Sequence, residues 1–377
     1  MKGNSNNMDK IKRWIEIYVP VTTCTLRCSY CYITTHRLFA GPLPKFEFTP
    51  DFLRQALSKE RLGGTCMLNF CAGGETLLAP KLLDYIRALL EEGHYISIVT
   101  NGTLTKRIEE IAEFPQELTA HLFLKFSYHY LQLKERGLLD TFFNNIRMIR
   151  DAGCSFTLEQ TPSDDAIPYR DEIIERAVKE LGAIPHITIA RDERIDGQLP
   201  ILTELSREEY KHTWGDKYRS ALFDYKLTIF EQPRKEFCYA GDWGVYLSLA
   251  TGDMRQCYQS NLSWNIYQDI SKPIPFCAIG HNCKEIHCYN GHSWISWGCI
   301  PELKAPTYGE LRNRVCVDGS EWLQPQMKAF MSSRLYESNE EYGVGKKLWI
   351  DIRNRFASFH NYYNKVMRKI KNIIKKQ

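Results

Sequence analysis

Three cysteines stand within eight residues in the segment CTLRCSYC, at Cys24, Cys28 and Cys31. A structural zinc site takes four protein ligands, and a disulfide takes two cysteines. Three thiolates with no fourth close by suit a metal centre that keeps one coordination position open for another molecule. The alternative is a zinc site in which His36 supplies the fourth ligand.

Further residues with useful chemistry follow three short segments rich in β-branched and aromatic residues. The motif GGE joins two glycines, which let the backbone approach a ligand closely, to a carboxylate that can hold an ammonium group. The motif TNG and a single serine occupy the corresponding places in the next two segments. If these segments are parallel strands, their carboxyl ends bring all of these residues to the edge that carries the cysteines. The residues are Gly73, Gly74, Glu75, Thr100, Asn101 and Ser127.

The first two thirds of the chain predict the scaffold that would position these residues. Strand-like segments alternate with segments whose apolar residues recur at helical spacing. This alternation is typical of parallel α/β units, and six units predict an incomplete (β/α)6 TIM-like barrel with its active site at the carboxyl ends of the strands. The predicted strands are 14–20, 66–72, 95–102, 121–129, 155–162 and 186–191, and the predicted helices are 49–60, 80–93, 106–112, 138–153 and 169–182.

The alternation stops after residue 200. A helical linker there leads into a segment rich in cysteine, glycine and tryptophan. We therefore expect a partial barrel at 1–232, a small cysteine-rich domain at 233–305 and a basic helical extension at 306–377. No internal repeat or low-complexity tract interrupts these parts.

The composition is that of a globular protein without a membrane span. Apolar residues make up 44% of the 377 residues and charged residues 25%. The amino-terminal segment is polar and lacks the apolar core of a signal peptide, and no run of about 18 apolar residues occurs. We therefore expect a cytoplasmic protein, in which the thirteen cysteines are better candidates for metal ligands than for disulfides.

The net charge of +4 is concentrated at the carboxyl end, where residues 343–377 hold ten lysines or arginines against one aspartate. Val366 and Ile370 lie at helical spacing among these lysines, which predicts a terminal helix. This helix is either solvated and packed by one apolar stripe, or in weak contact with an anionic membrane surface. We expect no nucleic acid partner, since interleaved aromatic residues and a nucleic-acid-binding fold signature are both missing.

The first motifs resemble those of the radical SAM superfamily. CTLRCSYC fits its CxxxCxxC signature, including an aromatic residue, Tyr30, before the third cysteine, and GGE stands where the family binds the amino group of S-adenosylmethionine. The resemblance implies that Cys24, Cys28 and Cys31 ligate a [4Fe–4S] cluster whose fourth iron is chelated by S-adenosylmethionine. It also implies TNG and serine contacts to that molecule, a 5′-deoxyadenosyl radical that abstracts hydrogen, and an electron donor such as flavodoxin or ferredoxin.

The second cysteine group resembles the opening of a SPASM/twitch extension, which carries auxiliary clusters. Thirteen residues separate the first cysteine from Gly252, and four separate Gly252 from the second cysteine. The later spacings depart from the seven-cysteine SPASM pattern, which favours a single auxiliary [4Fe–4S] cluster. A zinc knuckle using His281, His287 or His292 is the alternative. The ligands implied are Cys238, Cys257, Cys283 and Cys288, with Cys277 as a substitute and Cys299 as the remaining cysteine.

Candidate substrate residues lie near the ends of the fourth to sixth predicted strands, at His129, Glu159, Gln160 and Arg191. The expected substrate is a small polar molecule of sugar or aminosugar type, changed by epimerisation, dehydrogenation or dehydration. The alternative is a peptide or protein side chain. Only thirteen residues precede the first predicted strand, whereas peptide-modifying relatives often carry a leader-binding domain there. This favours the small molecule, or a protein target that is recognised without a leader. A non-catalytic iron–sulfur or zinc protein is the third hypothesis.

Overall fold

A computed structural model describes residues 9–31, 34, 36, 41–194, 199–260 and 262–357. Its centre is a nine-stranded sheet in the order β6-β5-β4-β3-β2-β1-β7-β8-β9. Strands β1 to β6 and β7 pair in parallel, whereas β8 and β9 are antiparallel. The strands are β1 (Arg13–Val19), β2 (Cys66–Ala72), β3 (Tyr95–Thr100), β4 (Leu122–Ser127), β5 (Ser155–Gln160), β6 (His186–Ile187), β7 (Gly244–Ser248), β8 (Asp253–Arg255) and β9 (Ser263–Asn265).

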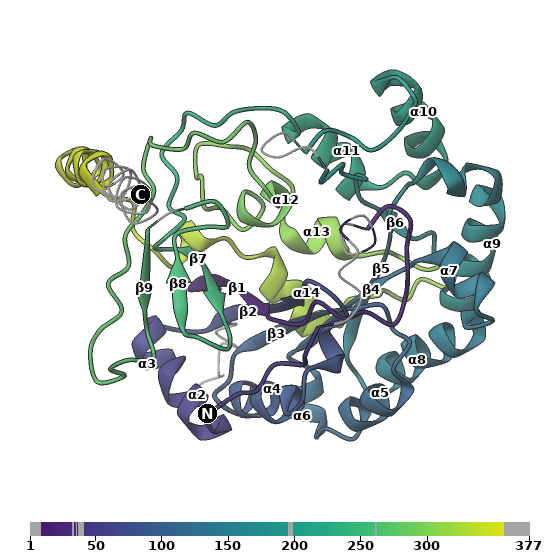
Figure 1. The fold of residues 1–377 in the computed structure, drawn as a ribbon, viewed down its shortest axis with the longest axis horizontal. Helices are drawn as coiled ribbons and strands as arrows, with labels where there is room; N and C mark the ends of the chain where they lie inside the picture. The colour runs from purple at the N-terminus through teal and green to yellow at the C-terminus, as the bar shows by residue number, and fades with distance from the viewer. Residues whose placement is uncertain are drawn as a thin grey trace, which may run out of the picture.

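Helices follow the parallel strands and surround the curved sheet, with the last three on its inner side (Figure 1). The first group comprises α2 (Pro50–Ala56), α3 (Lys59–Leu62), α4 (Leu82–Glu91), α5 (Thr105–Ala112), α6 (Gln116–Thr119), α7 (Tyr130–Glu135), α8 (Leu139–Asp151), α9 (Arg170–Leu181), α10 (Arg207–Tyr218) and α11 (Ala221–Ile229). The last three are α12 (Gly291–Trp294), α13 (Tyr308–Arg312) and α14 (Pro325–Ser332). Short 3₁₀ helices are η1 (Thr76–Leu78), η2 (Asp164–Tyr169) and η3 (Leu335–Glu337).

The predicted incomplete barrel of parallel β/α units is confirmed, with differences in detail. The helix expected over 49–60 is two helices, because the Ser58 hydroxyl accepts a hydrogen bond from the Arg61 amide at 3.3 Å and starts α3. Strand β6 keeps only two of the residues expected in 186–191. Helix α7 and strands β7 to β9 were not predicted, since these segments are short and lack a clear period.

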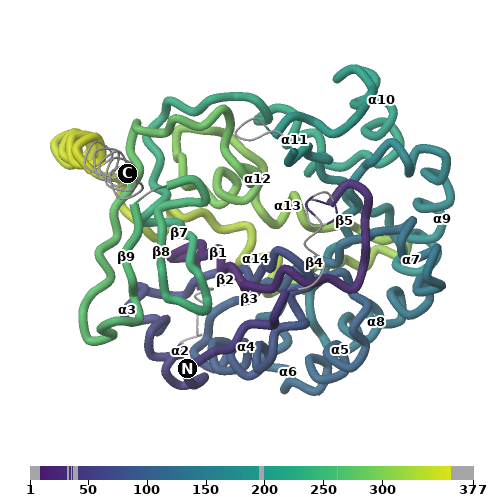
Figure 2. The backbone as a smooth tube through the Cα atoms, in the orientation of Figure 1, coloured from purple at the N-terminus to yellow at the C-terminus, as the bar shows by residue number. Residues whose placement is uncertain are grey.

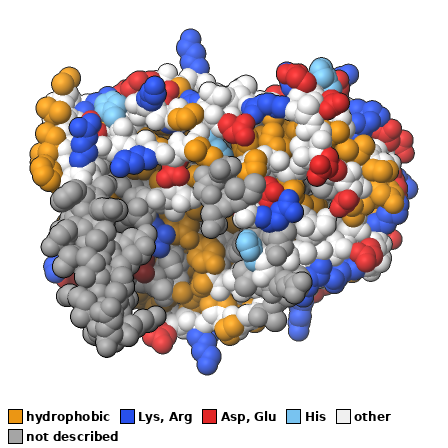
Figure 3. Space-filling view, turned by 45° about the horizontal axis from the view of Figure 1, so that its top comes forward, with side chains coloured by type: hydrophobic (Ala, Val, Ile, Leu, Met, Phe, Trp, Pro, Cys, Tyr) orange, Lys and Arg blue, Asp and Glu red, His pale blue; other side chains and the backbone are white. Residues whose placement is uncertain are grey.

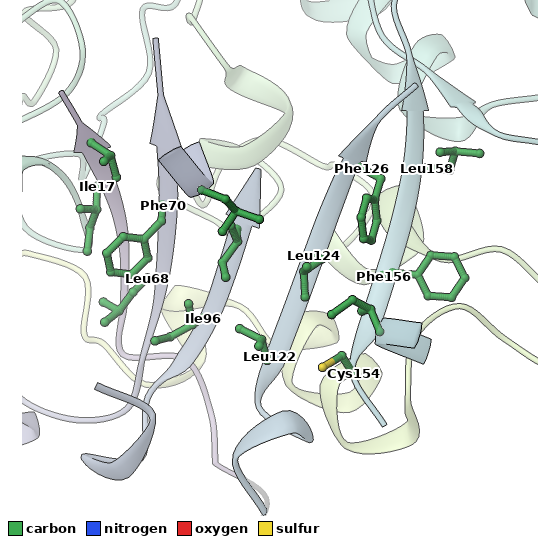
Figure 4. Close-up of a cluster of buried hydrophobic side chains, with 14 of the residues drawn as sticks. Ile17, Leu68, Phe70, Ile96, Leu122, Leu124, Phe126, Cys154, Phe156 and Leu158 are labelled. Atoms are coloured by element: carbon green, nitrogen blue, oxygen red, sulfur yellow. The ribbon is translucent and has the colours of Figure 1, made fainter. Parts of the chain in front are cut away.

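The outer face of the sheet packs against the helices that follow the strands. Alternate residues of β1 to β5, among them Ile17, Leu68, Ile96 and Leu124, point to this side and are fully buried (Figure 4). Burial of a side chain of this size contributes about 1.5–3 kcal/mol relative to its exposure. This apolar layer holds the strands in the arrangement that aligns their carboxyl ends.

The inner face is closed at its amino-terminal end by the carboxyl-terminal part of the chain. The ring centroids of Trp14 on β1 and Trp297 lie 5.7 Å apart, and those of Tyr95 on β3 and Phe330 on α14 lie 3.7 Å apart. The amide of Phe156 on β5 donates to the carbonyl of Trp322 at 3.1 Å. The segment assigned to the extension 306–377 thus begins as a layer packed into the barrel, and the proposed boundary before it stays a prediction.

The cysteine-rich segment continues the barrel sheet at its other edge. Strand β7 pairs with β1, with Trp14 opposite Gly244, and β8 and β9 extend the sheet further. A Cβ atom at Gly244 would lie 2.7 Å from the Trp294 ring and 2.9 Å from the Cys299 sulfur, so only glycine fits there. This join gives the second cysteine group a defined position relative to the first.

The chain is helical again from residue 344 to residue 357. The apolar side chains of Val344, Leu348 and Phe356 on this helix are 86%, 60% and 72% exposed. The predicted terminal helix around Val366 and Ile370 lies outside the described residues. Within the described part of the chain, every helix is too short or too polar to cross a membrane. On the face drawn in Figure 3, apolar side chains also gather near the middle.

Candidate functional site

The loop that carries the three cysteines is held at the strand ends by the GGE motif. The amide of Gly74 donates to the carbonyl of Val21 at 2.6 Å, and the amide of Glu75 donates to the carbonyl of Thr23 at 3.0 Å. A Cβ atom on Gly74 would lie 2.0 Å from that Thr23 oxygen. Glycine is therefore required here because two backbone segments touch, and this contact places Cys24 directly beyond β1.

The Glu75 carboxylate is buried, with 2% exposure, at the junction of β2 and β3. It accepts hydrogen bonds from the Thr100 hydroxyl at 2.7 Å, the Asn101 amide at 2.7 Å and the Leu77 amide at 3.0 Å. Burial raises the pKa of Glu75, and these hydrogen bonds oppose that effect. A carboxylate accepts about four hydrogen bonds, so capacity for an added ammonium group remains.

Asn101 connects the TNG turn to the cysteine loop. Its side-chain amide donates to the Thr25 hydroxyl at 2.8 Å and lies 3.6 Å from the Cys24 sulfur. Gly102 follows with a positive φ of 68°, a conformation that glycine adopts without strain. The motifs after β1, β2 and β3 thus form one connected cluster, as the sequence predicted from their places at the strand ends.

Cys24 and Cys28 lie in surroundings that disfavour ionisation of their thiols. Burial raises the pKa of Cys28 to about 12, and the neighbouring Cys31 and Cys24 add to the shift. Burial also raises the pKa of Cys24. A bound metal deprotonates such thiols outright, so this donor set fits an iron–sulfur cluster that supplies its own positive charge.

The same loop crosses the strand ends to reach the β4–α7 connection, visible as the purple segment after β1 in Figure 2. The Tyr30 hydroxyl lies 2.7 Å from Nδ1 of His129, and the Arg27 amide donates to the Gln132 side chain at 2.9 Å. Burial lowers the pKa of His129 to about 4, so its ring is neutral near pH 7. His129 therefore both anchors Tyr30 and borders the space beside the cysteines.

A cavity of about 290 Å³ opens beside Cys28. Its walls include His129 and Gln160, two of the predicted substrate residues. Ser127 and Glu159 pair across β4 and β5 just before these residues. Arg191 does not line this cavity and lies instead beside the second cysteine group.

The second cysteine group surrounds a separate cavity of about 40 Å³. The expected ligands line this cavity, and the additional member is Cys299 rather than Cys277. The Cys277 sulfur lies 3.8 Å from the side-chain oxygen of Asn354, and Gln256 donates to the Cys277 carbonyl at 2.8 Å. Cys299 reaches the cavity because its carbonyl accepts from the amide of Tyr239, next to Cys238, at 2.8 Å. The lining cysteines are Cys238, Cys257, Cys283, Cys288 and Cys299.

The histidines of the zinc alternatives differ in position. His287 lines the second cavity, whereas His281 pairs with Asp351 at 2.8 Å and His36 is exposed. Among the described residues, no three of His, Cys, Asp and Glu lie close enough to hold a single metal ion. In a cubane cluster each thiolate binds a different iron atom, so the cysteines need not converge on one point. Both cysteine groups are predicted to bind clusters of this kind.

The family model described as the radical SAM superfamily matches residues 18–159. The chain contains a radical SAM domain. The match runs from β1 to the end of β5 and includes the cysteine loop, GGE and TNG. The family predicted from those motifs is thereby confirmed for this domain, and S-adenosylmethionine and a [4Fe–4S] cluster are the cofactors that the match supports. No curated protein sequence matches this chain.

Solved structures similar to this radical SAM protein share little sequence with it. Streptococcus suis SuiB bound to S-adenosylmethionine is 14% identical with a TM-score of 0.48, over 70% of this chain and 65% of SuiB. The chain thus spans less than two thirds of the SuiB chain. The protein anSMEcpe with bound AdoMet is 14% identical with a TM-score of 0.48, over 94% and 96% of the two chains. BtrN in complex with AdoMet and 2-DOIA is 14% identical with a TM-score of 0.32, over 86% and 87%.

Several charged residues near the radical SAM site were not singled out from the sequence. Arg312 on α13 forms an ion pair with Glu159, and its side chain is 1% exposed. A lysine in the middle of the apolar segment HLFLKFSYH is the available signal for Lys125 on β4, as is a glutamate in WIEIYVP for Glu16 on β1. Arg312 and Lys226 carry no such signal, because they come from helices far along the chain.

Proposed function

We propose that this radical SAM enzyme cleaves S-adenosylmethionine reductively and abstracts hydrogen from a carbon of a small polar substrate of sugar or aminosugar type. The observation that carries the proposal is the 290 Å³ cavity, whose wall contains Cys28 of the cysteine loop together with His129 and Gln160. A molecule in that cavity lies next to the place where the radical is generated. The outcomes that fit are epimerisation, dehydrogenation and dehydration.

The bound cluster and S-adenosylmethionine supply the electron transfer and the hydrogen-abstracting radical, and an external donor such as flavodoxin or ferredoxin supplies the electron. The residues of this chain then have binding and positioning roles. Glu75 can accept a further hydrogen bond from the methionyl ammonium group. Asn101 holds the cysteine loop in place, because its side-chain amide donates to the Thr25 hydroxyl at 2.8 Å. Tyr30 and the neutral His129 close the wall beside Cys28.

We further propose that Cys238, Cys257, Cys283 and Cys288 hold one auxiliary [4Fe–4S] cluster. Two observations support this ligand set. The four cysteines line one cavity, and Cys238, Cys257 and Cys283 each add to the effect of burial in raising the pKa of Cys288. Four thiolates complete the ligand set of a cubane cluster. Such a cluster would bind substrate or pass electrons beside the radical site.

The test is anaerobic release of 5′-deoxyadenosine by the reduced, cluster-loaded protein with a panel of sugar and aminosugar phosphates, nucleotides and short peptides. Release that depends on a sugar-type compound supports the proposal. Release that depends on a peptide instead assigns the enzyme to side-chain maturation. A protein in which both clusters are assembled and which releases no 5′-deoxyadenosine with any donor contradicts catalysis. Cys316→Ser, at a half-buried cysteine outside both groups, is the matched control for cysteine variants.

We also propose weak contact between the helix at 344–357 and an anionic membrane surface. Apolar residues recur there at every fourth position and are exposed, and basic residues accompany them, which is the pattern of an interfacial helix. Cosedimentation with phosphatidylserine vesicles, lost in Leu348→Ser/Phe356→Ser, would support this contact. Concentration-dependent dimerisation in place of vesicle binding would assign the stripe to a second copy. The apolar stripe is Val344, Leu348, Ile352 and Phe356.

A further inference from the structure

The inner face of the sheet carries a layer of charged side chains between the two cysteine groups. Glu16 on β1, Lys125 on β4 and Glu159 on β5 belong to the strands, and Lys226 on α11 and Arg312 on α13 come from the helices that cover them. The charges of Lys125, Glu159 and Arg312 all act on Lys226, and those of Lys125 and Arg312 act on Glu16. These side chains therefore face one shared space.

The carboxylates of this layer are already engaged. Glu159 forms its ion pair with Arg312, whose side chain is almost fully buried. Glu16 is 4% exposed and accepts a hydrogen bond from the Asn69 side chain at 2.6 Å. Burial raises the pKa of Glu16, which favours its neutral form. Neither group is thus free to balance an additional cation.

The lysines, in contrast, have no carboxylate partner. Among the described residues, no acidic oxygen lies within 4 Å of the ammonium group of Lys125 or Lys226. The Lys226 ammonium donates to the Thr188 hydroxyl. Burial and the nearby charge of Arg191 lower the pKa of Lys226 to about 7, although Glu159 opposes this shift. The protein therefore gathers basic groups here without a carboxylate in direct contact with either lysine, and Lys226 carries only part of its charge near pH 7.

Polar atoms deeper in the same layer have no hydrogen-bond partner. The side-chain oxygens of Asn69 on β2, Ser97 on β3 and Thr157 on β5 are buried and unpartnered. The three residues are at most 1% exposed. Buried polar atoms are almost always hydrogen-bonded to protein, water or ligand, so these three oxygens keep unused hydrogen-bonding capacity within the layer.

The lysines remain reachable from the strand ends. Lys125, Lys226 and Arg191 are half-buried, and Lys125 precedes Ser127 at the edge of the cysteine loop by two residues. Arg191 and Lys226 line one small cavity of about 20 Å³ together with Cys288 of the second group. Arg191 and Lys226 therefore lie beside the second cysteine group, and Lys125 lies on the strand that leads to Ser127.

We propose that Lys125, Lys226 and Arg191 bind a phosphate or diphosphate group of the substrate. This inference rests on the proposed function and specifies its substrate class as a phosphorylated small molecule. Lys125, Lys226 and Arg191 against one carboxylate, Glu193 at 3.3 Å from Arg191, leave an excess of two positive charges when Lys226 is protonated. A bound phosphate ester, which carries about two negative charges near neutral pH, favours that protonated form. A single carboxylate would balance only half of that excess.

The experiment is an anaerobic calorimetric titration of the cluster-loaded protein with inorganic pyrophosphate at constant ionic strength. The variants are Lys125→Met and Lys226→Met, and the control is Lys106→Met at an exposed lysine on α5. Loss of a charge-assisted hydrogen bond should weaken pyrophosphate binding at least tenfold in Lys125→Met and in Lys226→Met, and the affinity of the control variant should equal that of the parent protein. Parallel titration with succinate tests a dicarboxylate in place of phosphate.

Two results would overturn the proposal. One is that the parent protein does not bind pyrophosphate, or binds it with the same affinity as Lys125→Met and Lys226→Met. The other is tighter binding of succinate than of pyrophosphate, which would assign the cations to a carboxylate. In the first case, a change in the reduction potential of the auxiliary cluster in these variants would assign the lysines to that cluster instead. Since the titration requires no turnover, its result is independent of 5′-deoxyadenosine release.

Discussion

The two cysteine groups of this enzyme are built in opposite ways. In the first, Cys24, Cys28 and Cys31 lie on one short loop, and GGE and TNG pin that loop to neighbouring strand ends. In the second, the cysteines come from Cys238 to Cys299 and meet around a cavity only through the packing of several segments. Ligands that lie on one loop can be predicted from their spacing in the sequence. Ligands that come from several segments cannot, because their arrangement depends on contacts between residues distant along the chain.

Removing the first group should have the largest effect. In Cys24→Ala/Cys28→Ala/Cys31→Ala we expect complete loss of S-adenosylmethionine cleavage, because no ligands remain for the first cluster. Since a cubane holds four irons, the iron content should fall from about eight to about four per chain. Metal analysis and 5′-deoxyadenosine release measure both effects. Retained release would refute the ligand assignment, and one zinc without iron would refute the auxiliary cluster.

The second group can be broken at a single position. Cys288→Ala should reduce the iron content by about four per chain, because the remaining three thiolates no longer close the cubane. Cys277→Ala should leave the iron content unchanged, since Cys277 lies beside Asn354 and away from the cavity. Cys299→Ala sharpens the comparison, because iron loss in this variant would replace one of the four expected ligands by Cys299. Metal analysis after anaerobic reconstitution distinguishes these results.

The join between GGE and the cysteine loop should matter for affinity more than for iron content. Glu75→Ala removes a carboxylate whose charge-assisted bond to an ammonium is worth about 1.5–3 kcal/mol, so S-adenosylmethionine binding should weaken roughly 10- to 150-fold. Equilibrium titration of the cluster-loaded protein measures the change. Glu91→Ala, at an exposed carboxylate on α4, is the control. An unchanged affinity in Glu75→Ala would confine Glu75 to holding the TNG turn.

At the amino-terminal end of the sheet, away from both cysteine groups, His94 should make the stability of the fold depend on pH. Burial lowers the pKa of His94 to about 4, and its ring bonds to the carbonyl of Leu57 at 2.8 Å and the amide of Cys66 at 3.2 Å. Below pH 6.5 the unfolded chain therefore binds a proton that the folded protein refuses, so stability falls as the pH decreases from about 6.5 to about 4.

His94→Gln keeps a donor and an acceptor but does not titrate, so this part of the pH dependence should disappear. The free energy of unfolding, measured by urea denaturation at several pH values, gives a slope against pH for each protein. These slopes should differ between parent and variant by at most about 1.4 kcal/mol per pH unit, and they should agree above pH 7. Equal slopes between pH 6.5 and 4 would show that His94 accepts its proton in the folded protein. Iron content should be the same in both proteins.

The prediction from sequence was most complete where chemistry and structure are both local. The positions of β1 to β5 and their helices followed from short-range periodicity, and the first ligand loop followed from a spacing of three and two residues. The role of Gly74 was anticipated as close approach to a ligand. The structure shows close approach to the backbone at Thr23, a contact that no spacing reveals.

By itself, the sequence determined the alternation of strands and helices and the family of the first domain, because hydrophobic period and ligand spacing are properties of contiguous residues. Only the tertiary structure decided that β7 joins the sheet beside β1, that Cys299 replaces Cys277 at the second cavity, and that Arg312 pairs with Glu159 inside the barrel. Each of these contacts joins residues that are distant along the chain. Their partners are selected by packing and by the cost of burying unpaired charge, and neither quantity is written in a local pattern.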